Sequence, residues 1–404
     1  MTVRCRLAAD VTAATPGGDG VTLETLPFGP LTVATDHPAL LLGLRDGMDE
    51  AALAPVADIL ARLVEGRLID WLAAAEDGTI LAVVEARDSG FAPKASSPVP
   101  PGAVLSRFAY FHREGGALVL DSAAVPARAR LDPALLHHPA VAGLLWRCGL
   151  LVAPDDAEDP LWSLHDRLFH AMTRFGRDAE ALGALDPGRG VIAPPPALAP
   201  LPDGPAVALP AVPAGPALLA RRRSGRDWAP AAVPLAVLSA LLRHALAVTG
   251  EMPTGPDGLA RLRRPYPSGG GLSALVADLA VDRVDGLAPG SYRYDEAGHR
   301  LIRHVGREVP AVAAIDAAAR ATTGRRPAVL LSLNLRHDRV AWRYAGLPYR
   351  LALLEAGAAL QTLSLMSAEL GLAACILGTG PADAGRGDGV LPVAEIALGI
   401  PGLA

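Results

Sequence analysis

Three clusters in the last part of the sequence combine residue types that could carry out chemistry. Residues 222–226 read RRSGR, residues 267–271 read PSGGG, and residues 342–344 read WRY. In that order they offer a phosphate clamp, a turn through which the backbone could approach a flat ligand, and a phenol beside a permanent cation. The chemistry indicated is that of a planar, phosphate-bearing cofactor next to a group that could accept a proton.

The first cluster consists of Arg222, Arg223, Ser224 and Arg226. Guanidinium groups bind a phosphate through two parallel hydrogen bonds, and a hydroxyl together with backbone N–H groups could complete such a site. Taken alone, an arginine run of this kind is more simply a solvated surface.

The second cluster is Pro267, Ser268, Gly269 and Gly270, followed by Gly271. Glycines after a rigid proline permit backbone conformations and close approaches that side chains forbid. Most such loops are only turns, and this one lacks the G-x-G-x-x-G spacing of a dinucleotide-binding fold.

The third cluster places Arg343 before Tyr344. Arginine stays protonated and cannot readily act as a base, but its charge could stabilise the phenolate of a tyrosine that does. The alternative is structural, with Arg343 paired to an acid and Tyr344 packed in an interface.

The elements around these clusters predict an α+β domain over residues 218–404. Helical patterns cover residues 234–248 and 349–370, and strand-like runs cover residues 279–281, 291–294, 328–335, 373–377 and 395–400. This mixed order favours helices packed on a mainly antiparallel sheet.

The preceding chain reads as a linker and two small modules. Residues 186–217 are dense in proline, which predicts an extended linker. Residues 1–100 and 101–185 each combine strands, a short helix and a hairpin, so we expect two winged-helix-like modules, the second with a connecting helix. Neither has a basic face, which favours peptide binding or dimer formation over DNA recognition. His165 and His170 lie on different faces of the connecting helix, so no metal site is expected.

Composition narrows the class of protein. Of the 404 residues, 51% are apolar and 20% charged, which predicts well-packed globular domains, and the net charge of −5 gives no electrostatic footprint for nucleic acid. Cys5, Cys148 and Cys375 form no motif, so neither a disulfide framework nor a zinc site is expected and a cytoplasmic location is favoured. Lys94 is the only lysine, so no lysine can act near the three clusters.

The most apolar run, residues 351–377, contains Glu355, Gln361 and Glu369, which would be costly in lipid. We therefore expect a buried helix rather than a membrane span. The first fifteen residues lack the apolar core of a signal peptide.

In combination and order, the three clusters resemble those of the SagB-type azoline dehydrogenases, the thiazole- and oxazole-forming branch of the nitroreductase-like flavoproteins. The resemblance covers roughly residues 155–404 and includes a tryptophan and His-Asp helix at residues 162–170. It implies a nitroreductase-like flavin domain at residues 218–404, FMN as the cofactor, and a homodimer with the cofactors at the subunit interface.

The resemblance also implies a role for each cluster. The arginine cluster would contact the phosphate and ribityl chain, the glycine turn would lie against the isoalloxazine ring, and a third segment starting at residue 371 would face the pyrimidine edge of the ring with its backbone N–H groups. The residues implied to bind the cofactor are Arg222, Arg223, Ser224, Arg226, Pro267, Ser268, Gly269, Gly270, Gly371, Leu377 and Gly378. Tyr344 and Arg343 are the catalytic candidates.

Several departures from the family pattern concern the substrate side of the site. Relatives have lysine in place of Arg343 and histidine in place of Ala358, whereas Tyr344 and Glu355 are retained. Residues 273–276 read SALV where relatives often have Tyr-Pro and a glutamate.

The activity implied is the FMN-dependent oxidation of azolines to azoles in a ribosomally made, post-translationally modified peptide. The N-terminal modules would dock a leader peptide or a cyclodehydratase partner. Two alternatives stay open: a flavin oxidoreductase acting on another natural-product intermediate, favoured by the lost lysine and histidine, and a non-catalytic scaffold of a biosynthetic complex.

Overall fold

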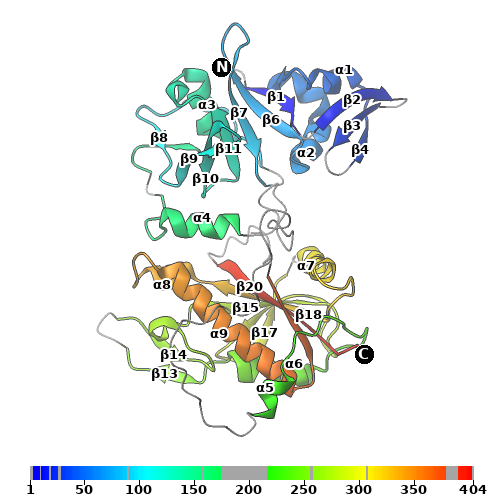
Figure 1. The fold of residues 1–404 in the computed structure, drawn as a ribbon, viewed down its shortest axis with the longest axis vertical. Helices are drawn as coiled ribbons and strands as arrows, with labels where there is room; N and C mark the ends of the chain where they lie inside the picture. Colours follow the sequence, from blue (N-terminus) through cyan, green and yellow to red (C-terminus); the bar gives the residue numbers. More distant parts are fainter. Residues whose placement is uncertain are drawn as a thin grey trace, which may run out of the picture. The chain divides into compact units, whose positions relative to one another are not determined.

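The computed structural model describes residues 3–9, 11–17, 20–25, 29–88, 91–156, 158–173, 216–254, 258–305, 308–378 and 390–402. The chain divides into two compact units, Met1–Glu180 and Ala181–Ala404, whose elements are labelled in Figure 1. The predicted linker at residues 186–217 lies outside the described residues, except for its last two, and stays a prediction.

A seven-stranded antiparallel sheet organises the first unit, with the strand order β5-β1-β6-β7-β11-β10-β9. Its strands are β1 (Arg4–Leu7), β5 (Met48–Asp49), β6 (Ile69–Ala74), β7 (Ile80–Ala86), β9 (Ala109–Glu114), β10 (Ala117–Ser122) and β11 (Ala127–Leu131). Both expected modules contribute strands, and they meet where β7 pairs with β11. The sheet is therefore continuous across the boundary expected near residue 100.

Short helices and two small sheets complete the first unit. They are β2 (Val11–Gly17), β3 (Gly20–Thr25), β4 (Gly29–Ala34), α1 (Pro38–Gly43), η1 (Glu50–Val56), α2 (Ala57–Glu65), β8 (Val104–Leu105), η2 (Pro133–Leu135), α3 (Pro139–Arg147), β12 (Leu151–Val152) and α4 (Leu164–Met172). The helical stretch from Glu50 to Glu65 is divided into the 3₁₀ segment η1 and the α-helix α2. Pro55 lies inside the 3₁₀ segment, and proline cannot supply the N–H that a continuous α-helix needs.

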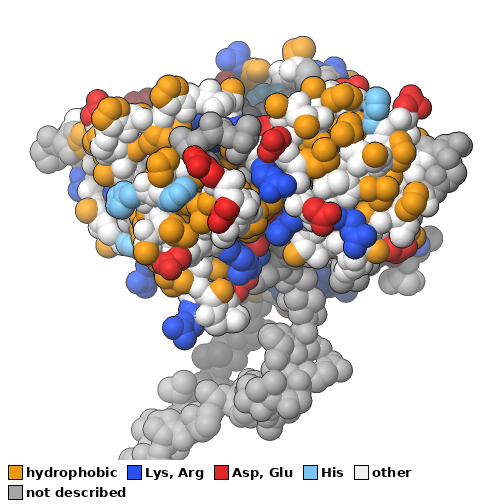
Figure 2. Space-filling view, turned by 90° about the horizontal axis from the view of Figure 1, so that it is seen from above, with side chains coloured by type: hydrophobic (Ala, Val, Ile, Leu, Met, Phe, Trp, Pro, Cys, Tyr) orange, Lys and Arg blue, Asp and Glu red, His pale blue; other side chains and the backbone are white. Residues whose placement is uncertain are grey.

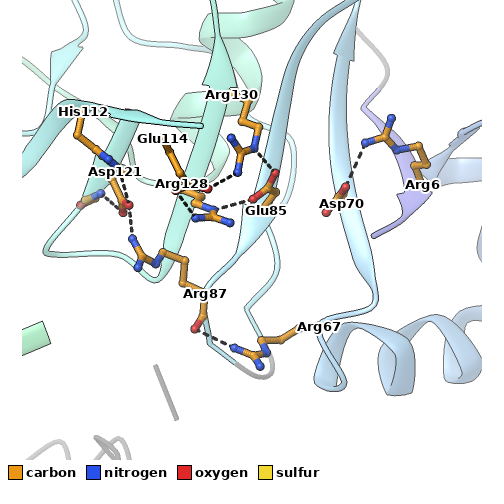
Figure 3. Close-up of polar contacts among 11 residues, drawn as sticks. Arg6, Arg67, Asp70, Glu85, Arg87, His112, Glu114, Asp121, Arg128 and Arg130 are labelled. Carbon is orange, nitrogen blue, oxygen red and sulfur yellow. Dashed lines mark hydrogen bonds and ion pairs between the residues drawn. The ribbon is translucent and has the colours of Figure 1, made fainter. Parts of the chain in front are cut away.

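Several arginines on the seven-stranded sheet of this unit are paired with acids (Figure 3). In β11, Arg128 and Arg130 alternate with buried residues, and both bind the carboxylates of Glu85 and Glu114 at 2.6 to 2.9 Å. Figure 2 shows one face of the molecule, on which basic and acidic side chains are mixed rather than gathered by sign.

A six-stranded antiparallel sheet, in the order β17-β16-β15-β18-β20-β19, organises the second unit. Its strands are β15 (Leu275–Val281), β16 (Gly290–Asp295), β17 (Arg300–Arg303), β18 (Val329–Leu335), β19 (Ala373–Leu377) and β20 (Leu391–Gly399). The other elements are α5 (Ala217–Arg221), α6 (Leu235–Leu246), β13 (Gly250–Met252), β14 (Arg261–Arg263), η3 (Gly269–Gly271), α7 (Glu308–Arg320), α8 (His337–Ala341) and α9 (Pro348–Glu369). Helices α6 and α9 pack on one face of this sheet and α7 on the other. The fold is thus the α+β arrangement expected.

Helix α9 has one buried face and one exposed face. Ala352, Ala356, Ala359 and Leu363 lie in the core of the unit, whereas the side of the helix that carries Leu354 is open, with Leu354 itself 63% exposed. By length and composition alone α9 could cross a membrane, but its buried face packs as that of a core helix does.

Candidate active site

The arginine cluster lies along the edge strand β19. After α5 the chain turns, and the Gly225 N–H donates to the Ala374 carbonyl at 2.9 Å. A Cβ atom on Gly225 would stand 2.9 Å from the Cβ of Ala373, so only glycine allows this approach. The buried Trp228 adds a hydrogen bond from its Nε1 to the Ala373 carbonyl at 3.3 Å. Residues 222–226 are thereby brought beside the segment that starts at Gly371.

The side chains of this cluster are available to a ligand. Arg223, Ser224 and Arg226 are exposed and Arg222 is half-buried. In the part of the chain that the structure describes, none of these four side chains makes a hydrogen bond or an ion pair. Arg221, in contrast, pairs with Glu369 at the end of α9. Three guanidinium groups and a hydroxyl fit the phosphate of FMN.

The glycine turn is built on left-handed backbone. Gly270 and Gly271 have φ values of 62° and 68°, and Ser273 shares this region at 51° although it has a side chain. A Cβ atom on Gly269 would stand 3.7 Å from Leu351 in the first turns of α9. Gly270 itself is exposed at the tip of the turn.

Arg343 and Tyr344 lie against this turn. They follow α8, and the Tyr344 hydroxyl is 2.7 Å from the position that a Cβ atom of Gly270 would occupy. The Arg343 Cζ is 5.7 Å from the centre of the Tyr344 ring, a cation–π distance. Tyr344 is half-buried, and its hydroxyl makes no hydrogen bond to another described residue. Two clusters that are over 70 residues apart in sequence therefore form one site.

Sequence reasoning missed the residues that hold the turn in place. Arg261 donates from Nε to the Gly270 carbonyl at 3.1 Å, and Arg339 donates to the carbonyls of Leu272 and Ala260. Glu355, noted only as a retained family residue, accepts a hydrogen bond from Ser268 at 2.8 Å. Burial raises the pKa of Glu355, and the Ser268 hydroxyl offsets part of that rise. The arginine-rich run at residues 261–264 was a sequence signal for the Arg261 contact alone.

Within one chain the two parts of the site lie at opposite ends of α9. Leu351 faces the glycine turn, and Glu369 pairs with Arg221 beside the phosphate cluster. These positions are separated by about 27 Å along an α-helix that rises about 1.5 Å per residue.

Comparison with known proteins gives a family match for the second unit. Residues 219–402 match the model of the nitroreductase family. No match was found among curated proteins.

Similar solved structures include a putative nitroreductase from Ralstonia eutropha (21% identity, 49% of this chain and 89% of that chain, TM-score 0.36). Another is the E. coli microcin synthetase complex with truncated pro-MccB17 bound (19%, 45% and 70%, 0.36). A third is a putative nitroreductase from Desulfovibrio desulfuricans in complex with FMN (18%, 46% and 86%, 0.29). With TM-scores this low, the assignment rests on the family match and not on these likenesses.

The second unit is therefore a nitroreductase-like domain, the class that its α+β fold and the family match define. The match supports a flavin-dependent oxidoreductase.

Proposed function

We propose that the protein is an FMN-dependent dehydrogenase of the SagB type that converts azolines to azoles in a ribosomally made, post-translationally modified peptide. The observation that carries this proposal is the contact between the Tyr344 hydroxyl and the tip of the glycine turn at Gly270. It puts a proton acceptor where the family resemblance puts the flat ring of the cofactor.

Each residue of the proposed site has its own role in the oxidation. Conversion of an azoline to an azole removes two hydrogens, one as a hydride and one as a proton. FMN, when bound, accepts the hydride. Tyr344 takes the proton from the ring carbon, and the Arg343 guanidinium lies beside the Tyr344 ring. Arg222, Arg223, Ser224 and Arg226 hold the phosphate.

A homodimer is part of this proposal. Because the phosphate cluster and the glycine turn lie at opposite ends of α9, a second copy of the chain would complete each site. The exposed side of α9 around Leu354 continues to Leu347 and Trp342, which are 42% and 57% exposed. An apolar surface of this kind fits a buried interface between subunits.

The first unit would dock the peptide or a cyclodehydratase partner. Support comes from a cavity of about 270 Å³ between α3, β6 and residues 96–99, lined by Ser96, Ser97 and Arg147 among apolar residues. A hollow with an apolar wall and a few polar groups suits a short segment of chain.

The test uses the full-length protein loaded with FMN and a peptide that already carries an azoline ring. We expect the peptide to lose the mass of two hydrogens and the flavin to bleach under anaerobic conditions in one turnover. Flavin that stays oxidised while the peptide is unchanged would refute azoline oxidation, and failure to bind any flavin would refute the cofactor.

A second candidate is a flavin oxidoreductase that acts on another natural-product intermediate. Arg343 in place of the family lysine and Ala358 in place of the histidine favour it. Bleaching of the flavin by a non-peptide substrate, with azoline peptides inert, would distinguish it from the first.

A further inference from the structure

A buried carboxyl group on α9 is hydrogen-bonded to the residue that precedes the glycine turn. Glu355 is 4% exposed, and its Oε2 accepts a hydrogen bond from the Ser268 hydroxyl at 2.8 Å. Ser268 Oγ in turn accepts a hydrogen bond from the Ser273 N–H at 2.8 Å. These two hydrogen bonds, together called the brace, connect Glu355 on α9 through the Ser268 hydroxyl to the Ser273 N–H, just after the turn.

The braced segment is strained. Ser273 has a φ of 51°, a left-handed conformation that costs a non-glycine residue on the order of 1 kcal/mol, and it is buried. Such a conformation persists only when surrounding contacts hold it, and the N–H of Ser273 is held by Ser268. A weaker contact joins the Ser273 hydroxyl to the Leu262 carbonyl at 3.3 Å.

We propose that Glu355 is a positioning residue of the active site, which acts through Ser268 to keep the Gly269–Gly271 turn in the shape that contacts the cofactor and Tyr344. This inference rests on the proposed function for the identity of the cofactor. The brace itself needs no cofactor, because each of its contacts joins two residues of the chain.

The surroundings of the Glu355 carboxyl group affect its pKa. Burial is the main cause of its raised pKa, while Arg264 and the Ser268 hydroxyl oppose the rise. Tyr266 and Arg339 also face the carboxyl group. Glutamine reproduces the hydrogen-bond acceptor without the charge, whereas alanine leaves the half-buried Ser268 hydroxyl without this acceptor.

The position of Glu355 on α9 adds a second consequence. Its neighbour Leu354 is 63% exposed on the proposed interface side, while Glu355 points into the core. The same turn of α9 therefore carries Leu354, on the proposed subunit contact, and Glu355, in the brace.

Hydrogen exchange measures the brace without any substrate or cofactor. In the full-length protein, the amides of residues 268–273 should exchange about tenfold faster in Glu355→Ala than in the wild type, the scale of one lost buried hydrogen bond. Glu355→Gln should exchange at the wild-type rate. Leu363→Ala is the matched control, because Leu363 is fully buried on the same helix but outside the brace. It should lower the melting temperature without a selective effect on the turn.

Flavin binding supplies an independent measurement. We expect Glu355→Ala to weaken FMN binding about tenfold and to shift the visible flavin spectrum, with Glu355→Gln and Leu363→Ala close to wild type. Equal exchange and equal affinity in the Glu355→Ala and Leu363→Ala variants would overturn the inference, as would a glutamine variant as impaired as alanine. If the wild type binds no FMN, the cofactor assignment fails while the exchange experiment still decides the brace.

Discussion

The Tyr344 hydroxyl lies 2.7 Å from the point at which a side chain on Gly270 would begin. Gly270 belongs to a turn that precedes β15, and Tyr344 follows α8, so that β15, β16, β17, α7, β18 and α8 lie between the two residues in the chain. The turn therefore cannot carry a side chain at its tip without moving the phenol. Position 270 has two reasons to be glycine, its backbone conformation and this contact.

Replacement of Gly270 by alanine should separate these two reasons. The new Cβ would displace the Tyr344 hydroxyl, so we expect azoline oxidation to slow at least tenfold, measured by flavin bleaching in a single turnover. Gly286→Ala is the matched control, because Gly286 has a φ of 73° and nothing within 4 Å of its Cβ position. Both variants should lose about 1 kcal/mol of stability from the left-handed backbone. Equal rates in the two variants would show that the contact has no role in the reaction.

Removal of the free arginines should weaken FMN binding. Arg222→Ala and Arg226→Ala should each raise the dissociation constant about 10- to 100-fold, because a hydrogen-bonded charge contributes about 1.5–3 kcal/mol. Arg221→Ala is the control, since Arg221 already pairs with the exposed Glu369 and such surface pairs contribute little. Fluorescence titration of FMN at two salt concentrations gives both the affinity and its electrostatic part. An Arg221→Ala variant weakened as much as the others would place the phosphate elsewhere.

A charged residue on the exposed side of α9 should dissociate the proposed dimer into monomers. Leu354→Glu puts a carboxylate on the exposed apolar side of the helix, and burial of that charge in an interface is costly. We expect light scattering to give a mass near the 41.6 kDa of one chain and FMN affinity to fall with it. Val305→Glu, at a residue 91% exposed, should leave both unchanged. A wild-type protein that is monomeric at micromolar concentration with flavin bound would contradict the shared site.

The sequence predicted the local elements of the second unit well, because their patterns are strong. The helix expected at residues 349–370 is Pro348–Glu369, and the strand expected at residues 373–377 is Ala373–Leu377. Helix α7 was missed. Its run of alanines, at positions such as Ala313, Ala314 and Ala317, has little apolar periodicity to mark a face.

Contacts between distant segments were beyond sequence reasoning. The pairing of β7 with β11, which joins the two expected modules in one sheet, depends on register and not on local pattern. In the site, the three clusters were recognisable by residue type. The contact of Gly270 with Tyr344 and the separation of the clusters along α9 are visible only in the structure. Cofactor binding by these residues stays a prediction.

The stability of the protein should depend on the ionisation of Glu355. Its pKa is raised in the folded protein by burial, from an ordinary value of 4.5. The folded state therefore holds the proton more tightly than the unfolded chain, so stability is fully present below about pH 4.5 and is lost as the pH rises through the folded pKa. Glu355→Gln cannot ionise and should remove that part of the decline. Urea denaturation at a series of pH values checks this, and parallel curves for the two proteins would contradict it.

The assignment of Tyr344 as the base can be decided by three variants. Tyr344→Phe should keep FMN but lose about 10²- to 10⁴-fold in the rate of azoline oxidation, the usual contribution of general base catalysis. Arg343→Lys keeps the positive charge beside the phenol and should retain activity, whereas Arg343→Ala removes that charge and should lower the rate of azoline oxidation. Tyr292→Phe is the control, because the Tyr292 hydroxyl donates to the Ala288 carbonyl within the same unit and its loss should cost only about 1 kcal/mol of stability. Wild-type rates in Tyr344→Phe would mean that the tyrosine only packs against the turn and that the proton goes to another group.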